Sequence, residues 1–267
     1  MGRPLSGRLV LVTKLRRHKE RALTRRFEAE LRYSTMSIDL LVFGPHPDDL
    51  EIGLGGTIAR YAALNLRVGL CDLTTGEMGS NGTPEERVAE GGRARAALGA
   101  AWRENLRWPD RRIGKDPAHL EEAVAFIRRH QPRTIAVPYW SDRHPDHVAA
   151  SEVLTEAVFN AGLRRYPGEG AAWKPDWICY YFINDSTAPS FLVDVSEQYE
   201  RKRAALDCHA TQFRRGESAA ATRLNTPLFR QLVESRDAQF GALAGVAWAE
   251  GVIVREPVVR TNLMRQA

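Results

Sequence analysis

Two short motifs in this sequence combine histidine and aspartate at spacings that could do metal chemistry. Residues 44–49 read GPHPDD and residues 143–147 read RHPDH, and each follows an apolar run that looks like a β-strand. A single His-Pro-Asp at the start of a helix is usually a cap, in which the carboxylate accepts hydrogen bonds from free N–H groups. Two copies, each with an additional acid or histidine, indicate two halves of one site.

The spacing of these residues predicts a metal site with three protein ligands. His46 and Asp49 are three positions apart, so in a helical turn their side chains point the same way. Imidazole nitrogen and carboxylate oxygen both bind Zn²⁺ at about 2.0–2.2 Å, and the third ligand can come from His144 or His147. Such a set leaves one position for water, and Fe²⁺ would accept the same ligands. We therefore expect the nearest ring nitrogens of His46 and His147 to lie within about 5 Å of each other.

Two acidic residues beside the expected ligands suggest roles in proton transfer and in orientation. Asp48 adjoins Asp49 but should point elsewhere, which would leave its carboxylate beside the bound water, where a general base is needed. Asp146 is placed to orient one histidine of its own motif through the ring N–H. The other histidine of that motif is then available to the metal.

The elements that position both motifs follow from alternating apolar runs and helical segments. We expect strands at 38–43, 67–73, 105–108, 133–137, 177–183 and 191–195, and helices at 50–64, 84–98, 117–130, 145–159, 197–208 and 227–243. This order is typical of one α/β domain with a doubly wound, mostly parallel, Rossmann-like sheet. Ligand sites in such sheets lie at the carboxyl ends of the strands, where both motifs fall.

A glycine-rich stretch, GLGG at 53–56, follows the first motif. It lacks the spacing of a dinucleotide-binding or phosphate-binding loop. We interpret these glycines as allowing the helix that contains them to pack close to the sheet.

Composition and charge distribution indicate how the chain is divided and where the protein is located. The chain has 267 residues, of which 43% are hydrophobic and 27% charged, and its formal net charge is +5. Basic residues crowd the N-terminus, so we interpret residues 1–36 as a basic extension, whether a disordered arm, a surface helix or the product of a misplaced start codon. Residues 37–267 form the expected catalytic domain. Three distant cysteines, the lack of a long apolar run and the lack of a signal peptide predict a cytoplasmic protein.

The motifs PHPDDLE, GEMGSNGTPEER and DRHPDH together resemble the LmbE/PIG-L family of zinc-dependent N-deacetylases. Further stretches, such as WPDRRIG, PYWSDRHPDH and AGVAWAEG, are similar to the branch that hydrolyses N-acetylglucosaminyl-malate in bacillithiol biosynthesis. The resemblance runs from about residue 38 to residue 257. It implies an LmbE-like fold, hydrolysis of the N-acetyl group of an N-acetylglucosamine glycoside, and a homo-oligomer, either a trimer or a hexamer.

The resemblance also implies roles for single residues of the two motifs. The zinc ligands that it implies are His46, Asp49 and His147. Asp48 would be the general base. His144, oriented by Asp146, would stabilise the tetrahedral intermediate and could protonate the leaving amine.

Other positions would bind the substrate or depart from the family pattern. The substrate-binding residues implied by the resemblance are Asn81, Arg87, Arg143 and Lys174. The two arginines would pair with the carboxylates of a malate group. Pro45 stands where the family usually has a small residue. Leu232 stands where some relatives have a tyrosine that lines the site, so His209 or a water would supply the missing polar contact.

Two alternatives stay open at this stage. The same site could deacetylate another amino sugar, such as a chitin disaccharide, a glycolipid or an antibiotic precursor. The basic extension could instead make the chain a nucleic-acid or anionic-surface binding protein with a vestigial metal site, but no basic motif interleaved with aromatic residues favours this. We therefore expect a small amino-sugar substrate and neither a nucleic-acid nor a membrane partner.

Overall fold

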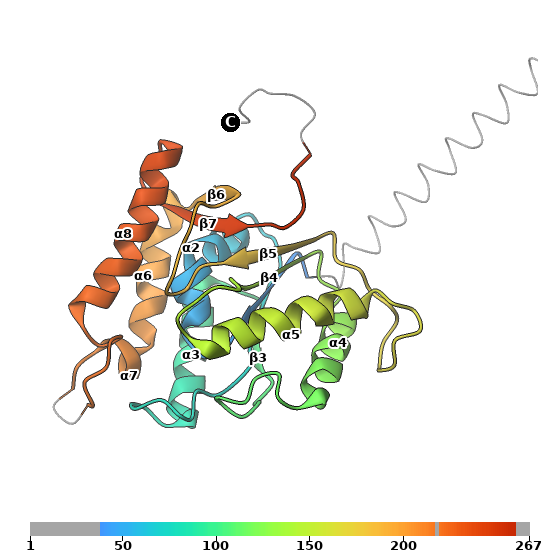
Figure 1. Cartoon of the computed structure of the whole chain (residues 1–267). Helices are drawn as coiled ribbons and strands as arrows, with labels where there is room; N and C mark the ends of the chain where they lie inside the picture. The colour runs from blue at the N-terminus through green and yellow to red at the C-terminus, as the bar shows by residue number, and fades with distance from the viewer. Residues whose placement is uncertain (1–37, 217–218, 260–267) are drawn as a thin grey trace, which may run out of the picture. The chain divides into compact units, whose positions relative to one another are not determined.

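The computed structural model describes residues 38–216 and 219–259, and the extension predicted at 1–36 lies outside the described residues. The elements follow in the order β1 (Leu40–Gly44), α2 (Asp49–Ala63), β2 (Val68–Asp72), α3 (Pro84–Leu98), β3 (Trp102–Asn105), α4 (Pro117–His130), β4 (Thr134–Pro138), α5 (Pro145–Ala161), β5 (Trp177–Tyr181), β6 (Phe191–Asp194), η1 (Ser196–Gln198), α6 (Tyr199–Cys208), α7 (Ala210–Phe213), α8 (Pro227–Ala244) and β7 (Ala249–Ile253) (Figure 1). Among these helices, none combines the length and the hydropathy that crossing a bilayer requires.

The strands form one mixed sheet in the order β3-β2-β1-β4-β5-β7-β6. Strands β3, β2, β1, β4 and β5 are parallel, and β7 runs antiparallel to both of its neighbours. The strand order reverses between β1 and β4, because the chain moves outward through β2 and β3 before it returns to the other side of β1. The carboxyl ends of β1 and β4 therefore flank a topological switch point, which is where open α/β sheets bind ligands.

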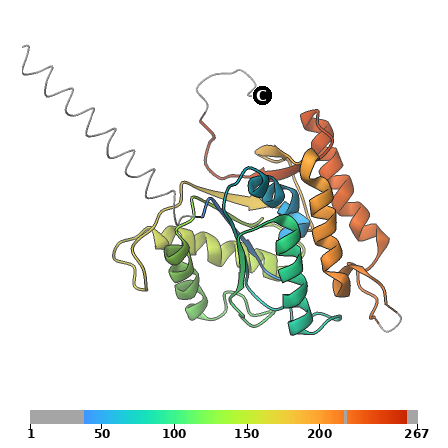
Figure 2. The ribbon, with the colours of Figure 1, turned by 180° about the vertical axis from the view of Figure 1, so that it is seen from behind.

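Helices cover both faces of the sheet (Figure 1; Figure 2). On one face α2, α3, α6 and α8 share a core cluster that contains Val42 and Phe229. On the other face α4 and α5 share a second cluster that contains Phe43 and Leu154. Strand β1 contributes to both clusters, since successive side chains of a strand point to opposite faces, and it is buried at every position. The predicted α/β class with a doubly wound, mostly parallel sheet is confirmed.

The predicted elements differ from the observed ones at two strands and at α7, a helix of four residues that was not predicted. The third strand lies at Trp102–Asn105, three residues before the predicted 105–108. Strand β7 was not predicted, because its sequence AEGVI opens with three residues that disfavour strands. Glu250 is buried in β7 by a salt bridge to Lys202, an interaction that no pattern of apolar residues can reveal.

Candidate active site

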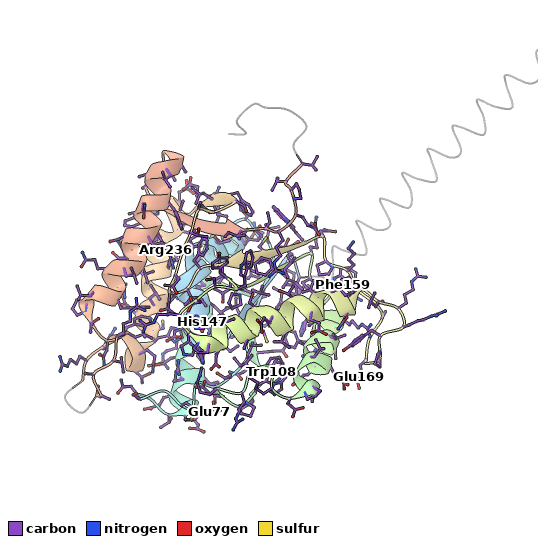
Figure 3. All side chains as sticks on the ribbon, viewed as in Figure 1. Glu77, Trp108, His147, Phe159, Glu169 and Arg236 are labelled. Atoms are coloured by element: carbon purple, nitrogen blue, oxygen red, sulfur yellow. The ribbon has the colours of Figure 1, made fainter. Side chains whose placement is uncertain are left out.

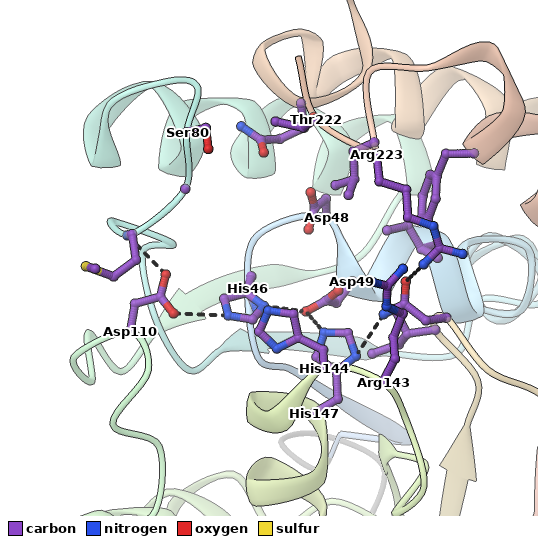
Figure 4. A pocket seen from close by; sticks show the side chains of 18 of the residues that line it. His46, Asp48, Asp49, Ser80, Asp110, Arg143, His144, His147, Thr222 and Arg223 are labelled. Atoms are coloured by element: carbon purple, nitrogen blue, oxygen red, sulfur yellow. Dashed lines mark hydrogen bonds and ion pairs between the residues drawn. The ribbon is translucent and has the colours of Figure 1, made fainter. Parts of the chain in front are cut away.

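A cavity of about 370 Å³ lies at the carboxyl ends of β1 and β4 (Figure 4). Both His-Pro-Asp motifs line it, the first from the turn after β1 and the second from the start of α5. The other walls come from the loops at 78–80, 110–111, 183–184 and 222–224 and from four helical residues, Ile52, Arg87, Gln212 and Phe229. The volume falls within the range of about 300–1,000 Å³ that is usual for small-molecule sites.

Asp48 has an unusual backbone conformation in the turn between β1 and α2. Its φ is 120° and its ψ is −29°, a region that costs a non-glycine residue about 1–3 kcal/mol. Asp48 immediately precedes α2, yet its side chain makes no capping hydrogen bond within the described part of the chain. The cap interpretation is therefore wrong for Asp48, and its carboxylate lines the cavity instead.

Three donor atoms from the two motifs converge at the floor of the cavity. Asp49 Oδ2 lies 3.0 Å from His46 Nδ1 and 3.3 Å from His147 Nε2. Ligands that bind one Zn²⁺ ion tetrahedrally are about 3.3 Å apart, given bonds of about 2.0–2.1 Å. Donor nitrogens of His46, His144 and His147 also lie within 4.8 Å of one another. The donor types, their spacing and their burial therefore fit a divalent metal ion.

The second ring nitrogen of each expected histidine ligand faces a carboxylate. His46 Nε2 lies 3.3 Å from Asp110 Oδ1 and 3.4 Å from Asp146 Oδ2. His147 Nδ1 lies 3.0 Å from Asp142 Oδ1. Such partners fix the orientation of a metal-binding imidazole and raise its basicity. The sequence assigned no role to two of these carboxylates, Asp110 and Asp142, although both lie in stretches that resemble the family, WPDRRIG and DRHPDH.

The partner of Asp146 differs from the prediction. Its carboxylate contacts His46 of the other motif and accepts hydrogen bonds from the backbone N–H and the guanidinium of Arg111, at 3.1 and 3.0 Å. His144 is the N-cap of α5, and its Nδ1 accepts a hydrogen bond of 3.2 Å from the Asp146 backbone N–H. His144 is thus oriented by the amide of Asp146, because the side chain at this helical position projects toward the first motif.

The charges in the cavity shift the pKa values of its titratable groups. Burial alone would lower the pKa of His147, but Asp49 and Asp142 raise it to about 9. Burial raises the pKa of Asp48 to about 6, although Arg87 opposes this shift. The floor of the cavity therefore favours positive charge at the histidine, which either a proton or a divalent cation can supply. Asp48 has the properties of a proton acceptor that works near neutral pH.

Arg87, one of the two predicted substrate arginines, lines the cavity but is almost fully buried. Its guanidinium donates to the carbonyl oxygens of Gly76 and Pro47, at 2.8 and 2.9 Å, and lies 3.5 Å from Asp48 Oδ2. These contacts hold the turn and place a positive charge beside Asp48. Its contact with a substrate carboxylate stays a prediction.

Three other arginines line the cavity, and only Arg143 among them was predicted. Arg111 is engaged by the Asp146 carboxylate. Arg143 is exposed and lines the cavity, as does Arg223 from the loop before α8. Arg223 donates a hydrogen bond of 3.1 Å to Asn184 Oδ1, and its guanidinium lies 5.4 Å from the centre of the Phe229 ring. The segment around Arg223 has no regular pattern, so the sequence alone gives no reason to select it.

Two predicted substrate residues lie elsewhere. Lys174 lines a different cavity, together with Phe159 and Trp177. Asn81 exchanges hydrogen bonds of 3.0 and 2.8 Å with the backbone of Ala220, so its amide joins two loops. Neither residue lines the active-site cavity that the described residues form, so a contact of either with substrate stays a prediction.

The two departures from the family pattern have different consequences. Leu232 is 40% exposed on α8, and Phe229, one turn earlier, is the residue of that helix that lines the cavity. His209 is buried, with Nε2 3.2 Å from Glu51 Oε2. It is not among the described residues that line the cavity, so it does not supply the polar contact of the missing tyrosine there. The carbonyl of Pro45 accepts a 2.9 Å hydrogen bond from the Thr74 hydroxyl, and the turn still presents its ligands to the cavity.

Comparisons with known proteins identify the family. The family model of the GlcNAc-PI de-N-acetylases (PIG-L) matches residues 41–158, which include both His-Pro-Asp motifs. A diacetylchitobiose deacetylase from Thermococcus kodakarensis is 29% identical over 225 residues, covering 80% of this chain and 81% of that protein. A 1D-myo-inositol 2-acetamido-2-deoxy-alpha-D-glucopyranoside deacetylase from Actinosynnema mirum is 31% identical over 227 residues, covering 65% of this chain and 80% of that protein. The chain belongs to the PIG-L family.

Similar solved structures support the fold, but they do not identify the reaction. The conserved protein TT1542 from Thermus thermophilus superposes with a TM-score of 0.78 at 38% identity, covering 86% of this chain and all of that one. The 4-carboxy-2-hydroxymuconate hydratase GalB from Pseudomonas putida superposes with a TM-score of 0.70 at 21% identity, covering 85% and 100%. A likeness as distant as the second shows the fold alone, so the activity has to be argued from the residues of the cavity.

Proposed function

We propose that this protein is a metal-dependent hydrolase that removes the acetyl group from an N-acetylglucosamine derivative. The observation that supports this most strongly is the convergence of His46 Nδ1, Asp49 Oδ2 and His147 Nε2 beside a separate buried carboxylate. Asp48 Oδ2, on that carboxylate, accepts no hydrogen bond from the residues that the structure describes. The names of the relatives, which are deacetylases of amino-sugar compounds, support the same reaction.

His46, Asp49 and His147 would hold the ion, which we take to be Zn²⁺ or Fe²⁺. An ion bound there supplies a Lewis acid that polarises the acetyl carbonyl and makes water more acidic. Asp142 and Asp110 hold the two imidazoles with their distal nitrogens engaged, so that the nitrogens near Asp49 stay available as ligands.

The proton transfers are assigned to Asp48 and His144. Asp48 Oδ2 takes the proton of the attacking water, and afterwards holds the proton that the leaving nitrogen needs. Nδ1 of His144 accepts the Asp146 N–H, so the neutral ring carries its proton on Nε2. His144 lines the cavity and can donate that N–H to the oxyanion as it develops. The products are acetate and the free amine.

We infer further that the substrate is a glycoside with an anionic aglycone, and specifically N-acetylglucosaminyl-malate. Arg143 and Arg223 both line the cavity, and both side chains are exposed there. Arginine pairs with carboxylates through two parallel hydrogen bonds, so two arginines suit a dicarboxylate such as malate. Arg223 would here take the role first expected of Arg87, whose guanidinium donates to the carbonyl oxygens of Gly76 and Pro47.

A substrate panel tests both parts of the proposal. We expect zinc-loaded protein to release acetate from N-acetylglucosaminyl-malate with a kcat/KM at least tenfold above that for N,N′-diacetylchitobiose. Arg143→Met and Arg223→Met should raise KM for the malate glycoside and leave the neutral disaccharide nearly unaffected. Preference for the disaccharide would reject the anionic aglycone, and no acetate from any N-acetylglucosamine derivative would reject the deacetylase.

A further inference from the structure

Helix α2 is broken one turn after the first motif. Leu54 has φ −133° and ψ 19°, so residues 49–53 form a separate first turn that includes the expected ligand Asp49. A break in a helix leaves carbonyl oxygens before it and N–H groups after it without their usual partners. Every residue from 49 to 59 is buried, so these groups need partners other than bulk water.

Two charged side chains from the C-terminal part of the chain supply those partners. Glu250 accepts hydrogen bonds from the backbone N–H groups of Gly56 and Thr57, at 2.8 and 2.7 Å, and so caps the second part of α2. Arg236, on α8, donates a hydrogen bond of 2.7 Å to the carbonyl oxygen of Ile52 in the first turn. The backbone groups on both sides of the break therefore have hydrogen-bond partners, Arg236 before it and Glu250 after it.

Arg236 also holds the second half of the metal site. Its guanidinium donates to the carbonyl oxygens of Phe182 and Ile183, just after β5, at 3.2 and 3.0 Å. The next residue, Asn184, donates from its backbone and its side chain to the Asp142 carboxylate, at 2.9 and 3.0 Å.

Asp142 in turn lies 3.0 Å from Nδ1 of His147. One cation thus joins the turn that contains Asp49 to the segment that orients His147. Figure 3 shows Arg236 on α8 and His147 at the start of α5.

Arg236 belongs to a chain of ion pairs between four charged side chains in the interior. Its Nε lies 3.1 Å from Asp237 Oδ1, and Asp237 Oδ2 accepts a hydrogen bond of 2.6 Å from Lys202 Nζ. Lys202 Nζ also donates to Glu250 Oε1 at 2.7 Å. We call these four residues the Arg236 network. Its two cations and two carboxylates compensate each other, which a buried ionic cluster requires.

We propose that Arg236 is a positioning residue that sets the separation between the two halves of the metal site. It lies outside the cavity lined by described residues, so it acts through Ile52 and Ile183 rather than by touching substrate or metal. The inference depends on the proposed function only in that the three ligands bind a metal ion. It does not depend on which substrate is hydrolysed.

Arg128 provides a matched control, because it does the same chemistry far from the site. It is a buried arginine on α4 whose guanidinium donates to the carbonyl oxygens of Ala161, Leu163 and Tyr166, beyond the carboxyl end of α5. The metal site lies at the other end of α5, and the 17 residues of that helix span about 25 Å. Replacing either arginine leaves buried carbonyl oxygens without donors, so both changes should destabilise the fold.

The test compares Arg236→Met with Arg128→Met in the full-length protein. We expect both variants to lower Tm, but only Arg236→Met to weaken Zn²⁺ binding, by at least tenfold in competition with a chelator of known affinity. Arg128→Met should bind Zn²⁺ within twofold of the wild type. Should Arg236→Met fail to fold, Arg236→Lys replaces it, because an ammonium group cannot span three carbonyl oxygens in the same plane.

Equal Zn²⁺ affinity of the Arg236 variant and the Arg128 variant would overturn the inference and leave Arg236 with a purely structural role. The binding measurement uses no substrate. A wild-type protein that releases no acetate would therefore refute the proposed function, while the comparison of metal affinities would still decide the role of Arg236.

Discussion

Asp48 and Asp49 are neighbours in the chain, yet their surroundings give them opposite properties. Asp49 contacts two histidines, and although it is buried, the positive charge of His147 keeps its pKa well below the usual value. Asp48, turned away by its positive φ, has an oxygen without a hydrogen-bond donor among the described residues and a pKa raised by burial to about 6. These opposite properties are the basis on which the proposed function assigns Asp49 as a metal ligand and Asp48 as the base.

Replacement of Asp48 by asparagine should separate catalysis from metal binding. Asp48→Asn keeps the shape of the side chain but removes the base, so we expect kcat to fall by about 10²-fold or more. The Zn²⁺ affinity, measured by chelator competition, should stay within about threefold, since Asp48 is not among the converging donor atoms. Normal turnover in this variant would show that another group accepts the proton.

The carboxylates behind the histidines should differ in their importance. Asp142 is the carboxylate found at Nδ1 of His147, whereas Asp110 shares Nε2 of His46 with Asp146. We therefore expect Asp142→Asn to weaken Zn²⁺ binding by about 10- to 100-fold, and Asp110→Asn by less. Isothermal titration of the two variants checks the order, and a larger loss for Asp110→Asn would contradict this view of the histidine partners.

At the scale of elements, the sequence predicts what depends on local pattern and misses what depends on contacts between distant segments. The apolar runs and capping residues around 84–98 and 117–130 locate α3 and α4 to the residue. Strand β7 could not be predicted, because its buried Glu250 is stabilised by distant partners. These are the Lys202 ammonium group and the free backbone N–H groups after the break in α2. The two motifs are recognisable because their chemistry is local in sequence, while Asp110 and Arg223 join the site only through the fold.

The GLGG interpretation makes a prediction about packing. A Cβ on Gly53 would lie 2.2 Å from the ring of Tyr181, whose hydroxyl is fixed by a hydrogen bond to the Phe43 carbonyl. Gly53→Ala should therefore destabilise the protein by about 1–3 kcal/mol through overpacking. Denaturant unfolding measures the change in the free energy of unfolding.

Gly92, on the exposed face of α3, serves as the control for Gly53. A Cβ there meets nothing within 4 Å among the described atoms, so Gly92→Ala should stabilise the helix by about 0.5–1 kcal/mol. Equal effects of the two substitutions would contradict the close approach of α2 to the sheet.

At the scale of the whole molecule, alternating strands and helices were enough to predict a doubly wound, mostly parallel sheet, while the strand order and its switch point came from the structure. The cavity walls were less predictable, because the loops at 78–80, 110–111 and 222–224 have no regular pattern. Lys174 was assigned to the site by the family resemblance, and in the structure it lies in the connection between α5 and β5, where it lines another cavity. The metal chemistry is therefore better determined by sequence than the choice of substrate.

Metal binding should contribute to the stability of the whole domain, because the three expected ligands come from segments about 100 residues apart in sequence. A ligand at 100 times its Kd stabilises the native state by about 2.7 kcal/mol. Removal of the metal by a chelator should then lower Tm by about 5–10 °C, given about 2–4 °C per kcal/mol for a domain of this size. Scanning calorimetry before and after restoring Zn²⁺ checks this, and an unchanged Tm would argue against a metal bridge between the motifs.

Anomalous diffraction at the zinc absorption edge, from crystals of zinc-loaded protein, tests the central claim most directly. We predict one strong peak at bonding distance from His46 Nδ1, an Asp49 carboxylate oxygen and His147 Nε2. A second group of possible ligands, formed by His46, Asp110 and Asp146, lies on the other side of the same imidazole. A peak only at that second group, or none at either place, would contradict the metal site on which the proposed function depends.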